Sequence, residues 1–112
     1  MSMCMLIFYV PAAHAEVVKA AVFAAGGGRV GNYDCCCWQT AGRGQFRPLE
    51  GSSPFIGETG KIEHADEIRI ELVCAAELLN DVIRALVDSH PYETPAYAYW
   101  EVNRDTCFGV SE

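Results

Sequence analysis

Residues 67–102 read EIRIELVCAAELLNDVIRALVDSHPYETPAYAYWEV, and half of the fold can be worked out from them. Apolar and charged residues alternate over 67–73, which predicts a strand with one face buried. An apolar stripe at helical spacing over 76–88 predicts an amphipathic helix. Because the residue before a proline avoids the α region, His90-Pro91 ends that helix. An aromatic segment, residues 97–102, is then predicted as a final strand.

The corner between that helix and that strand reads His90-Pro91-Tyr92-Glu93-Thr94-Pro95. Two interpretations are open for its polar residues. In the favoured one, His90 caps the end of the helix and Glu93 accepts backbone N–H groups, so that both stiffen the corner. In the other, His90 and Glu93 form a metal site or an acid/base pair.

The first half of the chain predicts one strand and one helix. Residues 3–10 form a continuous apolar run that Pro11 ends, which predicts a strand covered on both faces. Residues 14–25 carry apolar side chains at helical spacing, and Gly26-Gly27-Gly28 stops that helix.

The middle of the chain predicts an elaborated hairpin. Residues 32–40 are predicted as a second strand, and the turn residues 42–44 lead into a further extended piece at 45–49. A loop rich in glycine, serine and proline follows over 50–60.

This order of elements predicts an α+β fold of the ferredoxin-like type, βαββαβ, with an antiparallel sheet and two helices on one face. We expect a single domain over residues 1–112, with a core at about 3–102 and a tail at 103–112 that frays. The face without helices needs a cover, since the first strand is apolar on both sides. A second copy of the chain is the favoured cover, and the long hairpin folded back is the alternative.

Composition limits the classes of partner. The chain has 112 residues and a net charge of −7, which argues against binding to nucleic acid or to an anionic membrane. No apolar run approaches the roughly 20 residues of a membrane span, and residues 3–10 lack the flanks of a signal peptide. We therefore expect a cytoplasmic protein whose six cysteines are reduced.

Three of the cysteines, Cys35, Cys36 and Cys37, are consecutive and fall on the predicted second strand. They are candidate ligands for a soft metal ion, with His90 and Glu93 as further candidates. The favoured alternative is that the cysteines act as small buried apolar residues, since the chain has no C-x-x-C pair. His14 and His64 are expected to be solvated.

An ordered series of motifs resembles one family. Its members are Gly31-Asn32-Tyr33-Asp34, Cys36, Gly42-x-Gly44-x-Phe46-Arg47-Pro48, Glu50-Gly51, Pro54-Phe55-Ile56-Gly57, Gly60, Glu67-x-Arg69-x-Glu71 and His90-Pro91-Tyr92-Glu93-x-Pro95-Ala96-Tyr97. Over residues 3–102 the chain resembles the insert domain of YqfO proteins in the Nif-three-like family, which is itself similar to CutA and more distantly to PII signalling proteins. The resemblance implies a ferredoxin-like fold and a homotrimer whose sheets face inward.

The resemblance also bears on catalysis and on metals. Full-length members carry flanking lobes that hold a dinuclear metal centre, and this chain is expected to be the insert alone. A metal-dependent hydrolase is therefore the least favoured function, and the chain has no recognisable nucleophile with its base. Family members have His-Cys where this chain has Cys35-Cys36, and a smaller polar residue at Cys37.

Two functions remain in view. The first is a non-catalytic oligomeric binding or regulatory protein of the CutA/PII type, with ligand sites between subunits formed by Arg43, Arg47, His90, Tyr92 and Glu93. The alternative is a protein that binds a divalent or soft metal ion. The residues do not decide whether the protein also docks onto a separate protein partner.

Overall fold

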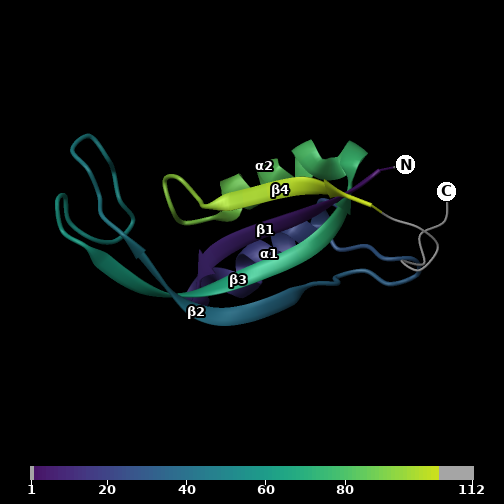
Figure 1. Ribbon diagram of the computed structural model, residues 1–112, viewed down its shortest axis with the longest axis horizontal. Helices are drawn as coiled ribbons and strands as arrows, with labels where there is room; N and C mark the ends of the chain where they lie inside the picture. The colour runs from purple at the N-terminus through teal and green to yellow at the C-terminus, as the bar shows by residue number, and fades with distance from the viewer. Residues whose placement is uncertain (1, 104–112) are drawn as a thin grey trace.

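The computed structural model describes residues 2–103 and contains four strands and two helices, shown in Figure 1. Short 3-10 turns at Ala12–His14 and Ala76–Leu78 precede the two helices. The elements are β1 (Met3–Pro11), α1 (Ala15–Ala24), β2 (Trp38–Phe46), β3 (Glu63–Ala75), α2 (Leu79–Ser89) and β4 (Tyr97–Val102). The sheet order is β2-β3-β1-β4, and every pair is antiparallel. This confirms the predicted ferredoxin-like fold.

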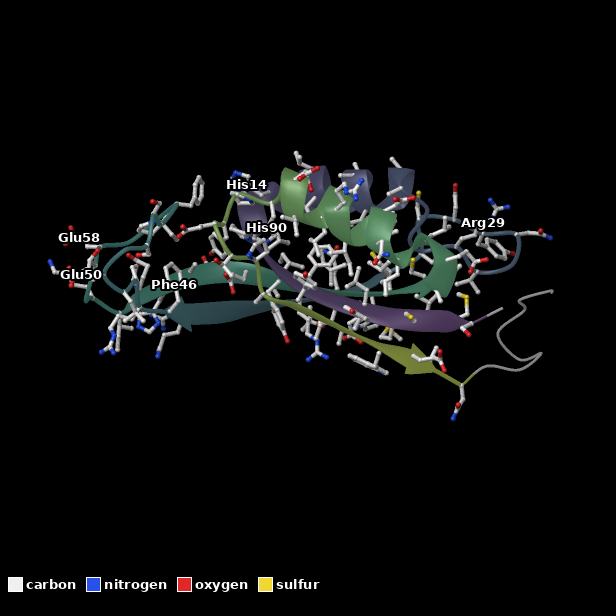
Figure 2. The ribbon with its side chains drawn as sticks, turned by 90° about the horizontal axis from the view of Figure 1, so that it is seen from above. His14, Arg29, Phe46, Glu50, Glu58 and His90 are labelled. Atoms are coloured by element: carbon white, nitrogen blue, oxygen red, sulfur yellow. The ribbon has the colours of Figure 1, made fainter. Side chains whose placement is uncertain are left out.

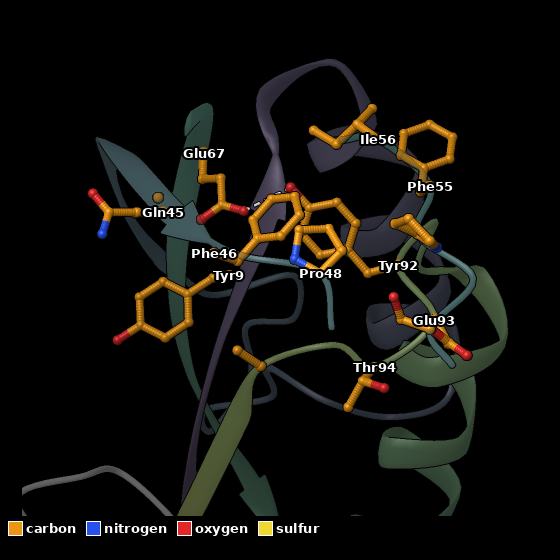
Figure 3. A pocket seen from close by; sticks show the side chains of 14 residues that line it. Tyr9, Gln45, Phe46, Pro48, Phe55, Ile56, Glu67, Tyr92, Glu93 and Thr94 are labelled. Carbon is orange, nitrogen blue, oxygen red and sulfur yellow. Dashed lines mark hydrogen bonds between the residues drawn. The ribbon is translucent and has the colours of Figure 1, made fainter. Parts of the chain in front are cut away.

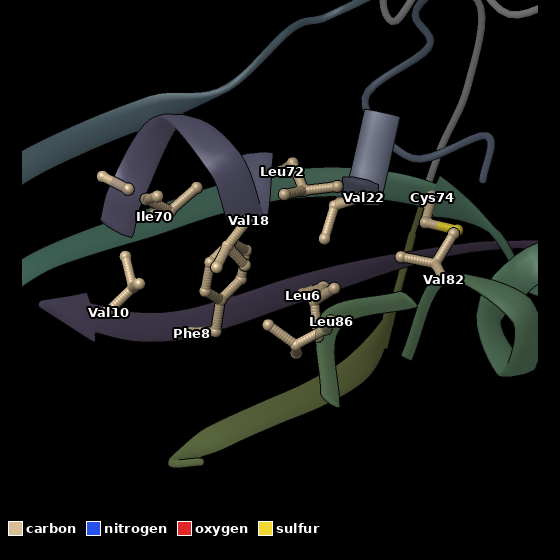
Figure 4. Close-up of a cluster of buried hydrophobic side chains, with 11 residues drawn as sticks. Leu6, Phe8, Val10, Val18, Val22, Ile70, Leu72, Cys74, Val82 and Leu86 are labelled. Atoms are coloured by element: carbon tan, nitrogen blue, oxygen red, sulfur yellow. The ribbon is translucent and has the colours of Figure 1, made fainter. Parts of the chain in front are cut away.

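The core lies between the sheet and the two helices (Figure 4). Alternate residues of the central strand β1 point into the core, namely Leu6, Phe8 and Val10. They pair in register with Leu72, Ile70 and Ile68 of β3, respectively. Both helices contribute their apolar stripes, with Val18 and Val22 from α1 and Val82 and Leu86 from α2. Full burial of each such side chain contributes about 1.5–3 kcal/mol.

The opposite face of the sheet carries apolar side chains but no helix (Figure 2). One row across this face runs Trp38, Glu71, Ile7, Ala98, and the next pairs Val73 with Met5 and Trp100. Trp38 is 70% exposed and Trp100 is 48% exposed. The bare face that the sequence predicts is therefore present within residues 2–103.

The predicted hairpin is wrong in its details. β2 runs from Trp38 straight through the supposed turn at 42–44, and Gly42 and Gly44 pair with Glu67 and Ala65 of β3. The chain reverses later, over 47–62, where Gly51, Gly57 and Gly60 have positive φ angles that suit glycine. β2 and β3 consequently form a long arm that projects past the end of α1, which we call the β2–β3 arm (Figure 1).

Residues 32–37 are not a strand. Val30 and Tyr33 form an isolated bridge, and Cys35 has a φ of 56°, the left-handed region that interrupts extended backbone. The thiols of the cysteine triplet therefore do not alternate across a sheet as predicted. Within residues 2–103 no helix is long and apolar enough to cross a bilayer.

Replacing Leu86 tests the packing of α2. Its side chain is 0% exposed, while that of the next residue, Val87, is 40% exposed. We expect Leu86→Ala to lower the free energy of unfolding by about 2–5 kcal/mol, because it leaves a cavity in the core. Val87→Ala should cost under about 1 kcal/mol. Urea titration followed by circular dichroism measures both, and equal costs would contradict the placement of α2.

Candidate functional site

His90 fastens the corner to the central strand. α2 ends at Ser89, and the backbone N–H of His90 donates to the Leu86 carbonyl at 3.0 Å, as expected of a helix cap. The imidazole Nε2 lies 2.7 Å from the carbonyl oxygen of Tyr9, at the end of β1. The Tyr92 backbone N–H donates to Nδ1 at 3.1 Å.

These two contacts define the tautomer of His90. A carbonyl oxygen only accepts, so Nε2 carries the proton, and Nδ1 must be unprotonated to accept from Tyr92. The side chain is 7% exposed. This burial lowers the pKa of His90, against smaller raising effects of the Tyr9 carbonyl and the Glu67 carboxylate. The neutral imidazole is thus a structural part of the corner. It bonds to the end of β1 and not to the last carbonyls of α2, so the side chain does not cap the helix as predicted, and the cap is the backbone N–H of His90.

Tyr92 joins the corner to the β2–β3 arm. Its hydroxyl donates to Glu67 Oε2 at 2.8 Å. Its ring centroid lies 5.8 Å from that of Phe46 and 6.3 Å from that of Phe55. Burial, and then the bond to Glu67, raise the pKa of the Tyr92 hydroxyl, so it remains a proton donor at neutral pH.

Glu93 ties the corner to the loop at the end of the arm. Its Oε1 accepts the backbone N–H of Ser53 at 2.9 Å. The sequence predicts that Glu93 accepts backbone N–H groups, and the structure confirms this. The donor comes from 40 residues away rather than from the turn itself.

A cavity of about 330 Å³ opens where the corner, the arm and its loop meet (Figure 3). Four aromatic rings, two prolines and two carboxylates dominate its wall. These are Tyr9, Phe46, Phe55, Tyr92, Pro48, Pro54, Glu67 and Glu93. This mainly apolar hollow with a few polar groups is typical of a small-molecule site.

Gly44 makes room for one of those carboxylates. A Cβ atom at this position would collide with the carboxylate of Glu67, while one at Gly42 would meet nothing within 4 Å. Both glycines lie in β2 beside β3. Glycine at position 44 therefore lets Glu67 lie across the strand and reach Tyr92.

The structure separates the residues that the sequence names as site candidates. Tyr92 and Glu93 line the cavity, and His90 supports it from behind. Arg43 and Arg47 are exposed on the β2–β3 arm and are not among the lining residues.

The cysteine triplet lies away from this cavity. The Cys36 N–H donates to the carbonyl of Gly28, beside Arg29, and Figure 2 shows Arg29 at the opposite end of the molecule from Phe46 and Glu50. Cys35 is exposed and Cys37 packs against the core. Within residues 2–103 no group of three or more His, Cys, Asp or Glu side chains is placed to hold a metal ion. Cys35, Cys36 and Cys37 thus do not share one site with His90 and Glu93 in a single chain.

Several residues of the site escape prediction from the sequence. Tyr9, Phe46 and Glu67 sit in segments that the sequence predicts only as extended, and only strand pairing brings them together. His14 is also not solvated as expected, because its ring packs edge-on against Phe55 at 5.5 Å and its Nδ1 is buried without a partner. His64 is exposed, as expected.

Comparison with known sequences finds relatives that are much longer. The chain is 42% identical over 96 residues to a Halalkalibacterium halodurans protein named GTP cyclohydrolase 1 type 2 homolog, covering 86% of this chain and 26% of that protein. A Mycobacterium tuberculosis protein of the same name is 45% identical over 91 residues, covering 81% and 24%. The chain therefore spans about a quarter of the length of these curated relatives. No family model matches the chain.

The same fold occurs in solved structures both as a part of a longer chain and as most of a chain. A Bacillus cereus protein related to NIF3 superposes with a TM-score of 0.79 and 38% identity, covering 92% of this chain and 26% of that one. CutA from Xylella fastidiosa superposes with a TM-score of 0.66 and 20% identity, covering 94% and 88%. At that identity the likeness to CutA concerns the fold alone.

The pKa of His90 predicts how stability depends on pH. The neutral ring is favoured in the folded state, so its contribution is complete above the ordinary value of 6.5 and is lost as pH falls through the lower folded value. We expect the free energy of unfolding to fall below pH 6.5 by up to about 1.4 kcal/mol per pH unit. Urea titrations at a series of pH values measure this slope.

Two variants isolate the contribution of His90. His90→Gln removes the titrating group and should flatten the slope, whereas His64→Gln, at an exposed histidine, should leave the slope unchanged. A wild-type slope that survives in His90→Gln would show that other groups cause it.

Gly44→Ala tests the contact between Glu67 and Tyr92. The new methyl group displaces the Glu67 carboxylate, and we expect a loss of about 1.5 kcal/mol, the contribution of a hydrogen bond to a charged group. Gly42→Ala in the same strand should change stability by less than about 0.5 kcal/mol. Repeating both in a Tyr92→Phe background completes a double-mutant cycle. An equal cost of Gly44→Ala in both backgrounds would exclude this hydrogen bond as its cause.

Proposed function

We propose that this chain, which is similar to one part of longer NIF3-related proteins and has a CutA-like fold, is a non-catalytic binding protein that acts as a homo-oligomer. The assembly in this proposal is the trimer expected from the sequence resemblance. Its sheets face one another, and its ligand sites lie beside the corner formed by residues 90–95.

The uncovered sheet face is the observation that carries the proposal. Trp38 and Trp100 are exposed on its two edge strands, Trp100 beside Met5 and Trp38 beside Glu71. Soluble monomers rarely expose contiguous apolar patches of this kind. Burial of apolar area stabilises an interface by about 25 cal/mol per Å², so a cover over these side chains is favoured.

A second copy of the chain fits this face better than an internal segment does. The loop at 47–62 folds toward the corner and encloses the cavity, so it does not cover the sheet. The hairpin alternative from the sequence therefore loses its support. The face also carries the Arg69–Glu71 ion pair, with Nε and Oε2 3.3 Å apart, which offers a neighbouring copy both signs of charge.

The candidate site residues take different parts in this proposal. Tyr92 and Glu93 line the cavity within one chain. Arg43 and Arg47 are exposed on the projecting arm, and in this proposal they contact a ligand or a neighbouring copy from outside the cavity wall. His90 positions the corner and does not touch the ligand.

The activity in the name of the relatives is not part of the proposal. Those proteins are about four times as long as the matched segment, and their name describes the whole protein. Within residues 2–103 three titratable side chains of the cavity wall, Glu67, Tyr92 and Glu93, are engaged in structural hydrogen bonds.

Light scattering coupled to gel filtration tests the assembly. We expect the wild-type protein at micromolar concentration to have about three times the chain mass of 12.3 kDa. Trp100→Glu places a charge on the open face and should give single chains, because a buried unpaired charge is costly. Val17→Glu, at an exposed position of α1, should leave the mass unchanged. A wild-type mass of one chain would refute the proposal.

A further inference from the structure

The wall of the cavity at the corner is negatively charged. Its 14 lining residues include the carboxylates of Glu67 and Glu93 but no lysine, arginine or histidine. The exposed Arg43 and Arg47 lie nearby in sequence yet contribute nothing to the wall. The wall therefore favours a cation over an anion.

The two carboxylates of the wall are hydrogen-bond acceptors with capacity to spare. Glu67 accepts the Tyr92 hydroxyl through Oε2, and Glu93 accepts the Ser53 N–H through Oε1. Within residues 2–103 these two carboxylates accept no further hydrogen bond. The Tyr92 proton is already committed to Glu67, and the Ser52 hydroxyl donates to the Leu49 carbonyl at 2.7 Å. A ligand that donates hydrogen bonds therefore fits the free oxygens of Glu67 and Glu93.

The remaining wall is aromatic. Tyr9, Phe46, Phe55 and Tyr92 all line the cavity, and Figure 3 shows the rings of Phe46 and Tyr92 between Glu67 and Glu93. Aromatic faces attract ammonium groups, by about 0.5–2 kcal/mol, and also bury the apolar part of a ligand. A bare metal ion fits less well, since no three ligating side chains converge within residues 2–103.

We propose that this cavity binds a small primary ammonium compound with an apolar or aromatic group. The ammonium group donates to the free carboxylate oxygen of Glu67 or of Glu93, which lie on either side of the rings, and the apolar group lies against Phe46, Phe55 and Tyr92. The proposal rests on the proposed binding function and names its ligand class. The cavity itself lies within one chain, so it does not depend on the oligomer.

The negative charges are held in place before the ligand arrives. Glu67 is oriented by Tyr92 and by the space at Gly44, and Glu93 by the backbone of Ser53. Tyr92 is in turn oriented by Nδ1 of His90. Such preorganisation lowers the entropic cost of binding.

Isothermal titration calorimetry with phenethylamine, a primary ammonium at pH 7.5, tests the proposal. The neutral isostere 2-phenylethanol has the same shape without the charge, and we expect it to bind at least about tenfold more weakly. Glu67→Gln keeps an oxygen that accepts from Tyr92 but removes the charge, and Glu93→Gln removes the other charge. The variant that lacks the carboxylate in contact with the ammonium group should bind the amine about tenfold more weakly.

Glu71→Gln is the matched control. Glu71 lies on the same strand and the same face as Glu67, but it pairs with Arg69 and does not line the cavity. We expect this variant to bind phenethylamine as the wild type does. Circular dichroism confirms that each variant is folded before titration.

The outcomes separate this inference from the proposed function. Equal affinity for the amine and the alcohol, or no detectable binding of the amine, overturns the ammonium site. The same holds if Glu67→Gln and Glu93→Gln leave the affinity unchanged. In those cases a trimeric mass would leave the proposed assembly standing. A monomeric protein that binds the amine selectively would refute the proposed assembly and leave the ammonium site standing.

Discussion

The imidazole of His90 is the contact on which the rest of the site depends. It donates to the carbonyl of Tyr9 and accepts the N–H of Tyr92, so it joins the end of the central strand to the corner that follows α2. The Tyr9 N–H also donates to the carbonyl of Ala96, at 3.2 Å. Both backbone polar groups of Tyr9 are thus bonded to residues 90–96. This arrangement needs a neutral ring, which burial provides.

From that anchor the constraint spreads to the β2–β3 arm. Tyr92, once placed by His90, reaches Glu67 with its hydroxyl and Phe46 and Phe55 with its ring. Glu93 then fastens the loop through Ser53. Three segments far apart in the sequence are therefore joined by few contacts, and the cavity is the space left between them. Its wall is apolar and negatively charged because strands and loop contribute rings while β3 and the corner contribute carboxylates.

The two ends of the molecule differ in character. The end at the corner is held by side-chain hydrogen bonds and by tilted and edge-on contacts between rings. At the other end, the turn after α1 is held by backbone bonds, such as those from Gly28 to Val73 and from Cys36 to Gly28. The cysteine triplet follows that turn and is thereby kept away from His90 and Glu93. A site that combined all five side chains is incompatible with an elongated fold of 49 × 24 × 22 Å.

The sequence alone predicted the order of elements, the sheet with one bare face, the end of α2 at His90 and the role of Glu93 as an acceptor. Local patterns suffice for these features, because hydrophobic periodicity and proline act within a few residues. It mispredicted the turn at 42–44, since glycine in a strand resembles glycine in a turn until the neighbour that needs its space is known. Glu67, Phe46 and Tyr9 carry no local signal, and only pairing of the strands and folding of the loop bring them to Tyr92. The fold was therefore readable from periodicity, whereas the cavity was decided by tertiary contacts between distant segments.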